Sequence, residues 1–244
     1  MADSQALTEL IEAWRGVANG REPYVLPGDM RLIKDPPYAN KERERHRDTR
    51  FRFNLLPIPY GGDLRKARVY VLMLNPSLRT ASSEVEGADE WENNLRNLKQ
   101  ENPGWLNDRE KGYWEVKFRR LAAELQPSLG ERMDAMLFLA DNICILELVP
   151  YRSAFFIGFN RDMRRLEAVR LIRRFVEEDL LVRAEEGRAL VAVVRGSRVW
   201  AQGWRTLDNV VIYPPQKAQS ASFSPQLPGG AQIFQYLKRL CEEL

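Results

Sequence analysis

Short apolar runs alternate with helical patterns along this chain. Four runs predict buried strands, at residues 67–74, 142–149, 189–194 and 209–213. The first contains VYVLML, apolar at nearly every position, which is typical of a parallel strand covered on both faces. Apolar residues at helical spacing predict helices at 4–20, 113–125, 161–183, 197–202 and 233–244.

This alternation predicts an α/β fold: a three-layer sandwich with a central, mostly parallel four-stranded sheet flanked by helices. Residues 21–66 are rich in Pro and Gly, with a charged run between the turns, so they predict an irregular arm laid over a core. We therefore expect a single domain over residues 1–244, with an N-terminal helix and an extended arm (1–66).

A polar segment, or one containing Pro or Gly, follows each predicted strand. In open parallel sheets, ligands bind at the carboxyl ends of the strands. The candidate site segments are therefore Asn75-Pro76-Ser77, Tyr151-Arg152-Ser153, Arg195-Gly196-Ser197 and residues 216–224.

Composition removes several kinds of chemistry. His46 is the only histidine, and it lies in the charged run KERERHRDTR, which excludes HExxH zinc sites and multi-histidine metal sites. The chain also lacks GxxxxGK[ST] and GxGxxG, the usual signatures of ATP hydrolysis and of dinucleotide-linked redox chemistry. Cys144 and Cys241 form no CxxC pair, so they predict reduced thiols in the core. We expect no metal and no cofactor.

Charge and hydropathy bound the partners. A net charge of +3 permits a nucleic-acid partner without requiring one. No apolar run approaches the roughly 18 residues that span a bilayer, and residues 1–15 lack the basic-then-apolar order of a signal peptide. We expect a cytoplasmic monomer with no membrane partner. We interpret the arginines at 161–174 as a solvent-exposed helix face, balanced by neighbouring acidic residues.

The strand-end side chains each allow two interpretations. Asn75 can hold a water or a base edge through its amide, and Pro76 would fix its orientation; alternatively, the pair forms a plain turn. Arg152 and Arg195 fit either a rim ion pair of small energy or a phosphate or base contact. Tyr151 fits either packing or stacking.

Residues 57–77, PIPYGGDLRKARVYVLMLNPS, resemble the first motif of the uracil-DNA glycosylase superfamily. They look most like its mismatch-specific branch, in which an apolar strand ends in Asn-Pro-Gly or Asn-Pro-Ser. The segment QSASFSP, residues 219–225, stands where the second motif follows the last strand. The segments GYWEVKFRRL, ELVPYRS and VVRGSRVW are similar to a bacterial branch of Asn-Pro-Gly proteins. The resemblance covers roughly residues 57–244.

The resemblance implies excision of a base that is flipped out of the stack into a pocket. Asn75 would position the attacking water, and no metal would be needed because the site stabilises a cationic sugar. Tyr151 would stack on the base, and Arg152 would contact the base or a phosphate. Phe223 would wedge into the vacated stack. The remaining predicted nucleic-acid-binding residues are Pro76, Ser77, Ser153, Arg195, Ser220, Ser222 and Ser224.

Two departures from that family open alternatives. The efficient branches carry Asp or Glu in the first motif and usually His in the second, whereas this chain has the neutral Asn75 and no histidine there. An amide activates water less than a carboxylate does. The alternatives are a catalytically weak or inactive nucleic-acid- or nucleotide-binding module, and a hydrolase of small nucleosides or nucleotides. The expected partner is DNA, with a nucleotide or nucleoside as the alternative.

Overall fold

The structure, a computed structural model, describes residues 3–33, 50–78, 87–105, 113–156, 158–204, 206–214 and 223–244. The chain divides into two compact units. Unit 1 comprises Met1–Gly61, Met73–Pro103 and Leu146–Asp179; unit 2 comprises Gly62–Leu72, Gly104–Ile145 and Leu180–Leu244. The expectation of a single domain over 1–244 stays a prediction.

The α/β class is confirmed, and the sheet has five strands rather than the predicted four. Their order is β1-β3-β2-β4-β5, and β4 pairs in parallel with both β2 and β5. The predicted three-layer arrangement stays a prediction. The strands are β1 (Tyr60–Gly61), β2 (Val69–Met73), β3 (Ile143–Glu147), β4 (Leu190–Val193) and β5 (Val210–Ile212).

The additional strand makes the sheet mixed. Ile58 N–H donates to Pro150 O at 3.0 Å and Glu147 N–H to Pro59 O at 2.9 Å, so the chain entering β1 runs antiparallel to the chain around β3. By contrast, Leu148 N–H donates to Met73 O at 3.3 Å. Val149 N–H then donates to Leu74 O at 3.0 Å, so both chains advance in the same direction, as in parallel pairing. The carboxyl ends of β2 and β3 therefore point the same way.

Three of the four predicted strands are buried along their whole length, whereas β5 is buried at its middle residue alone. All residues of β2, β3 and β4 are buried, which explains the unbroken apolar runs in the sequence. Tyr70 is the polar exception in β2, and its hydroxyl donates to Leu64 O at 2.9 Å, so burial leaves no donor unpaired there.

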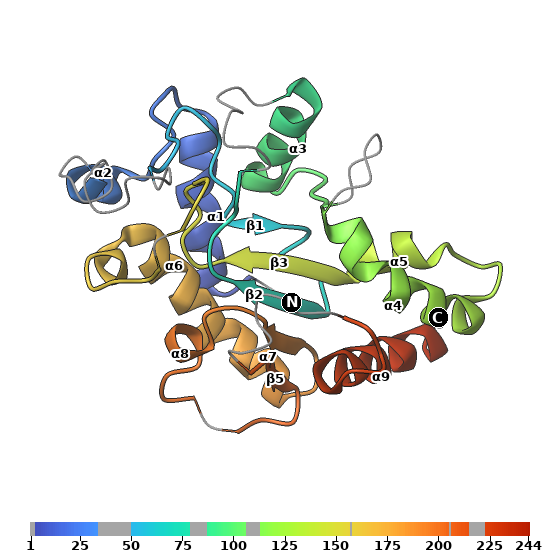
Figure 1. Cartoon of the computed structure of the whole chain (residues 1–244). Helices are drawn as coiled ribbons and strands as arrows, with labels where there is room; N and C mark the ends of the chain where they lie inside the picture. Colours follow the sequence, from blue (N-terminus) through green and yellow to red (C-terminus); the bar gives the residue numbers. More distant parts are fainter. Residues whose placement is uncertain are drawn as a thin grey trace. The chain divides into compact units, whose positions relative to one another are not determined.

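In unit 1, helix α1 (Gln5–Ala18) contacts both α3 (Ala88–Lys99) and α6 (Glu167–Phe175), as Figure 1 shows. Ser4 caps α1 by accepting Leu7 N–H at 3.1 Å. The helix α2 (Pro27–Ile33) contacts α6. The prediction of irregular structure in the arm was wrong for α2. The polar sequence of residues 78–111 predicts a loop, and this was wrong for α3.

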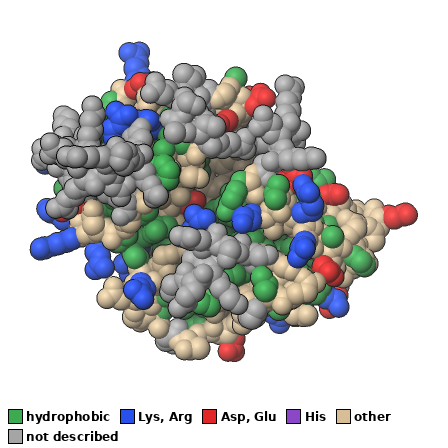
Figure 2. Space-filling view, viewed as in Figure 1, with side chains coloured by type: hydrophobic (Ala, Val, Ile, Leu, Met, Phe, Trp, Pro, Cys, Tyr) green, Lys and Arg blue, Asp and Glu red, His purple; other side chains and the backbone are tan. Residues whose placement is uncertain are grey.

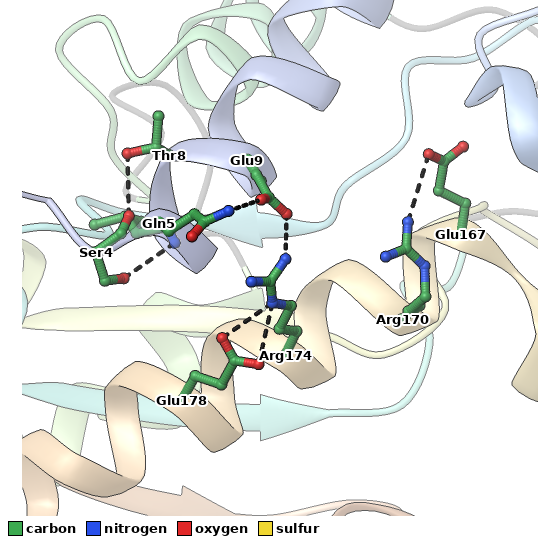
Figure 3. A network of polar contacts seen from close by, with 9 residues as sticks. Ser4, Gln5, Thr8, Glu9, Glu167, Arg170, Arg174 and Glu178 are labelled. Atoms are coloured by element: carbon green, nitrogen blue, oxygen red, sulfur yellow. Dashed lines mark hydrogen bonds and ion pairs between the residues drawn. The ribbon is translucent and has the colours of Figure 1, made fainter.

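Glu9 of α1 and Glu178 both pair with Arg174 of α6, at 2.5 and 3.0 Å (Figure 3). Arg170 and Glu167 form a longer pair, 3.9 Å, one turn apart on α6. The arginines within α6 thus interact with carboxylates of unit 1, as the sequence analysis expected of this face.

The predicted helix 161–183 is divided into four pieces. A 3-10 turn, Met163–Arg165 (η1), precedes α6, and a π-helical stretch, Val176–Leu180, separates α6 from α7 (Leu181–Glu185). Apolar spacing cannot detect such a change of helix type, because the buried positions continue through it.

In unit 2, helix α9 (Pro228–Glu242) contacts α4 (Tyr113–Leu129), β4 and β5, and Figure 1 shows it beside β5. Helix α5 (Ala135–Asn142), which the sequence analysis did not predict, packs on α4. A short helix α8 (Ser197–Trp200) follows β4. Cys144 and Cys241 are free and buried, which confirms the prediction for both.

No helix in the described ranges combines the length and the apolar character needed to cross a bilayer. On the face drawn in Figure 2, basic, acidic and hydrophobic side chains are interspersed.

Candidate functional site at the ends of β2 and β3

Asn75 follows β2 and lies within unit 1, where it is nearly buried. Its Nδ2 donates to Val149 O at 3.0 Å and to Tyr151 O at 2.6 Å. Its Oδ1 accepts the Ser153 hydroxyl at 3.0 Å. One amide therefore fastens the end of β2 to the chain that leaves β3. The two amide hydrogens are used, and Oδ1 retains the capacity to accept a second hydrogen bond.

The segment Tyr151-Arg152-Ser153 lies between two other stretches of unit 1. Ser153 bridges in parallel to Ser77 and in antiparallel fashion to Phe51. Arg52 N–H donates to Arg152 O at 2.9 Å, and Leu78 N–H donates to Ser153 O at 3.1 Å. Backbone hydrogen bonds thus hold Arg152 from one side and Ser153 from the other.

Tyr151 is buried, with 1 % of its surface exposed. Phe53 meets its ring edge-on with centroids 5.5 Å apart, and Phe51 and Trp14 lie 6.0 and 6.2 Å away. This is an aromatic cluster of the kind that stabilises cores. Stacking of a base on Tyr151 stays a prediction, and it requires these rings to uncover one face.

The Tyr151 hydroxyl donates to Asp29 Oδ2 at 2.5 Å and accepts Leu26 N–H at 3.2 Å. Burial and the neighbouring Asp29 charge raise the pKa of Tyr151 well above its usual value. The phenol therefore stays protonated and keeps donating to the carboxylate.

Asp29 is fully buried and joins three elements of unit 1. In addition to the Tyr151 hydroxyl, it accepts the backbone N–H of Glu167 and that of Ala168, the latter at 3.2 Å, at the start of α6. A carboxylate at a helix N-terminus satisfies N–H groups that have no partner within the helix. Burial raises the pKa of Asp29, although these three hydrogen bonds act in the opposite direction.

Arg152 is nearly buried, with 5 % of its side chain exposed, and it pairs with Glu90 of α3 at 2.7 Å. A third of the Glu90 side chain is exposed. The arrangement holds a guanidinium beside the strand ends, with a carboxylate against it. Arg152 thus forms an ion pair, although its side chain is nearly buried and not at the rim, and a phosphate or base contact stays a prediction.

Pro76 is buried beside Asn75, whereas Ser77 is exposed. Six predicted residues lie in unit 1: Asn75, Pro76 and Ser77 follow β2, and Tyr151, Arg152 and Ser153 follow β3. Ser77 is the one exposed residue of the six, and Oδ1 of the nearly buried Asn75 keeps one acceptor position that no described residue fills.

The predicted residues of unit 2 have different surroundings. Phe223 is buried, 4.4 Å from Phe118 between ring centroids and 6.3 Å from Tyr213. A wedge role for Phe223 stays a prediction, and it requires this ring to leave the cluster. Burial also raises the pKa of Tyr213 to about 12.

Ser224 is buried, and its hydroxyl hydrogen-bonds to Gln226. Arg195 follows β4; its backbone N–H donates to Leu72 O at 3.2 Å, and its side chain is half-buried. Ser220 and Ser222 lie outside the described residues. Phosphate binding by these residues stays a prediction.

Sequence reasoning missed two carboxylates at the site, Asp29 and Glu90. Asp29 lies in the arm, in LPGD, and Glu90 lies in a polar stretch that was expected to be a loop. No spacing in the sequence links either residue to the strand ends. Among the residues that the structure describes, no group of three or more His, Cys, Asp and Glu side chains is arranged to hold a metal.

No protein-family model matches the chain, and neither a curated protein nor a solved structure matches it. The resemblance to the uracil-DNA glycosylase superfamily therefore rests on the motifs alone.

Proposed function

We propose that this chain is a DNA glycosylase-like hydrolase that cleaves the N-glycosidic bond of a flipped, damaged or modified base. The observation that carries the proposal is the hydrogen-bonded contact between Asn75 and the segment Tyr151-Arg152-Ser153. The segments that follow β2 and β3 are more than seventy residues apart in sequence. They supply an amide, a guanidinium and hydroxyls at the carboxyl ends of adjacent parallel strands. In α/β sheets this is the place where ligands bind.

In the proposed reaction, Asn75 Oδ1 accepts a hydrogen bond from a water through its remaining acceptor position. The water oxygen bonds to the anomeric carbon of the sugar while the carbon–nitrogen bond breaks, and the base leaves with the electron pair. The proton that the water loses ends on the departing base. Ser153 holds the amide in place, so Asn75 contributes orientation rather than proton abstraction.

Arg152 and Ser77 are proposed to contact the base or the adjoining phosphate, and Pro76 to fix the direction of Asn75. A phosphate that reaches Arg152 would compete with Glu90 for the same guanidinium. In this proposal the phosphate backbone is bound by Arg195, Ser220, Ser222 and Ser224. The proposed three-layer sandwich carries the two motifs, residues 57–77 and 219–225.

A binding module without turnover is a second candidate, and a specific observation favours it. Both amide hydrogens of Asn75 are donated to backbone carbonyls, and its immediate partner is the neutral Ser153 hydroxyl. The carboxylates that contact the site residues, Asp29 and Glu90, are themselves engaged by Tyr151 and Arg152. A site with a neutral water-binding group catalyses less than one with a carboxylate base.

One set of assays separates the candidates. Duplexes carrying uracil, hypoxanthine or alkylated bases are incubated with the protein, and alkali converts any abasic site into a strand break. Hydrolysis predicts breaks with wild type and fewer with Ser153→Ala, which loses one hydroxyl but keeps the backbone bridges. Salt-sensitive binding without breaks supports the binding module. Activity on free nucleosides alone supports a small-molecule hydrolase. If the protein shows no binding and no cleavage of any of these substrates, the glycosylase, the binding module and the small-molecule hydrolase are all contradicted.

A further inference from the structure

The arginines that precede α6 differ from those within it. Arg161, Arg164 and Arg165 are exposed, and none of them forms an ion pair with a carboxylate among the described residues. Within α6, each arginine has a glutamate partner, at 3.9 Å for Arg170 and 2.6 Å for Arg173. The interpretation of a balanced helix face therefore applies to α6 and not to the turn before it.

Buried apolar residues and local hydrogen bonds hold the segment that carries the three arginines. Met163 and Leu166 are fully buried. Asn160 accepts Met163 N–H through its side chain at 2.9 Å, and Arg165 N–H donates to Asp162 O at 2.9 Å. Arg164 and Arg165 belong to the 3-10 turn η1, and Arg161 precedes it by two residues. The turn is thus fixed by apolar residues while its guanidiniums extend into solvent.

Aromatic residues accompany these arginines. The Arg164 guanidinium lies over the Phe159 ring, 5.9 Å from its centroid. Phe155, two residues after Ser153, is 44 % exposed. Asp162 is the single acidic residue between 158 and 166, so the turn keeps a net positive charge. A half-buried ring beside an exposed arginine suits a nucleic-acid strand, because rings stack on bases and guanidiniums bind phosphates.

We infer that Arg161, Arg164 and Arg165 form a phosphodiester-binding surface that holds the strand next to the nucleotide in the strand-end site. We call these three residues the arginine turn. The chain connects them directly to that site, since eight residues separate Arg152 from Arg161. The inference rests on the proposed function only in taking nucleic acid as the partner, and it does not require hydrolysis.

The arginine turn is tested by fluorescence anisotropy with a labelled single-stranded oligonucleotide and the matching duplex, at several salt concentrations. The variant is Arg161→Gln/Arg164→Gln/Arg165→Gln. The matched control, Arg119→Gln/Arg170→Gln/Arg173→Gln, removes the same charge from arginines that each pair with a glutamate three or four residues away. Circular dichroism confirms that both variants fold.

The slope of log affinity against log salt is negative, and loss of three phosphate contacts reduces its magnitude by about 2 for a single strand. We expect that change, and at least about tenfold weaker binding at low salt, in the arginine-turn variant and not in the control. Equal binding by the two variants overturns the inference and leaves nucleic-acid binding intact. Wild-type binding to anionic phospholipid vesicles but not to oligonucleotides, or to neither, also overturns it. Weaker binding by the variant together with absence of abasic sites supports the arginine turn and contradicts the hydrolase.

Discussion

The Tyr151 hydroxyl lies 2.5 Å from Asp29 Oδ2, and both side chains are buried within unit 1. This contact joins α2, in the arm, to the segment that leaves β3. Through the same carboxylate, the arm also binds the first N–H groups of α6. The backbone of Tyr151 in turn accepts from Asn75, so one residue connects the arm to the candidate site.

Tyr151→Phe keeps the ring and removes the hydroxyl. The change leaves Leu26 N–H without its acceptor and Asp29 without one of its donors. Leaving buried polar groups unsatisfied costs about 1–3 kcal/mol, so we expect a loss of that size in the free energy of unfolding, measured with urea. Tyr24→Phe is the matched control, because the Tyr24 ring packs on Trp91 and its hydroxyl makes no hydrogen bond among the described residues. Equal losses in the two variants contradict the assignment.

Asp29 predicts a pH dependence with a definite sign. Its folded-state pKa is raised above 3.8, so the folded protein holds this proton more tightly than the unfolded chain does. The buried charge lowers stability at neutral pH, and this cost is removed as the pH falls through the raised pKa, with the full gain present below 3.8.

Asp29→Asn does not titrate at this position. The stability advantage of wild type over Asp29→Asn should therefore grow as the pH is lowered from 7 towards 4, in urea unfolding at each pH. Asp141→Asn, which removes an exposed carboxylate from α5, serves as the charge-matched control. An advantage that shrinks on acidification contradicts the raised pKa.

Asn75→Asp tests the role of the amide hydrogens. An aspartate places carboxylate oxygens against Val149 O and Tyr151 O, where Nδ2 now donates, and the repulsion leaves two buried acceptors without donors. We expect a loss of about 3 kcal/mol or more in unfolding free energy, and no gain in base excision despite the new carboxylate. Wild-type stability together with faster excision would show that the side chain turns towards a substrate instead.

Phe223→Ala tests whether that ring belongs to the core of unit 2. The ring is buried and contacts Phe118, so truncation should cost about 3–5 kcal/mol. Phe155→Ala, at an exposed phenylalanine, should cost much less. Thermal unfolding of the two variants decides the matter. If Phe223→Ala unfolds at the wild-type temperature while its DNA binding falls, the ring acts as the predicted wedge.

The strands could be predicted because burial on both faces leaves unbroken apolar runs. The predicted run at 67–74 contains β2, and the predicted run at 142–149 contains β3. Strand β1 could not be predicted, since Tyr60–Gly61 is too short to show any period. Helix α3 was missed because two of its buried positions are the asparagines Asn94 and Asn97, which a hydrophobic pattern does not register.

The site was predictable only where it follows from the sheet. Asn75 and Ser153 end neighbouring strands, and strand-end residues of adjacent parallel strands meet at one edge. Their hydrogen bond agrees with that reasoning. Asp29 is 122 residues from Tyr151 in sequence, and a carboxylate that pairs with a distant hydroxyl leaves no spacing to recognise. The pairing of Glu90 with Arg152 could not be predicted either, because Glu90 lies on α3, whose sequence is mostly polar.

The most direct test of the strand-end site is an NMR titration of the Asn75 side-chain amide and the Ser153 backbone amide with an oligonucleotide that contains a stable abasic-site analogue. The Asn75 amide group is held by two carbonyls, so its paired resonances should be separate from those of solvent-exposed amides. The proposed function predicts that both sets of resonances shift in proportion to bound oligonucleotide, whether or not hydrolysis occurs. Saturating binding that leaves Asn75 and Ser153 unshifted would contradict it.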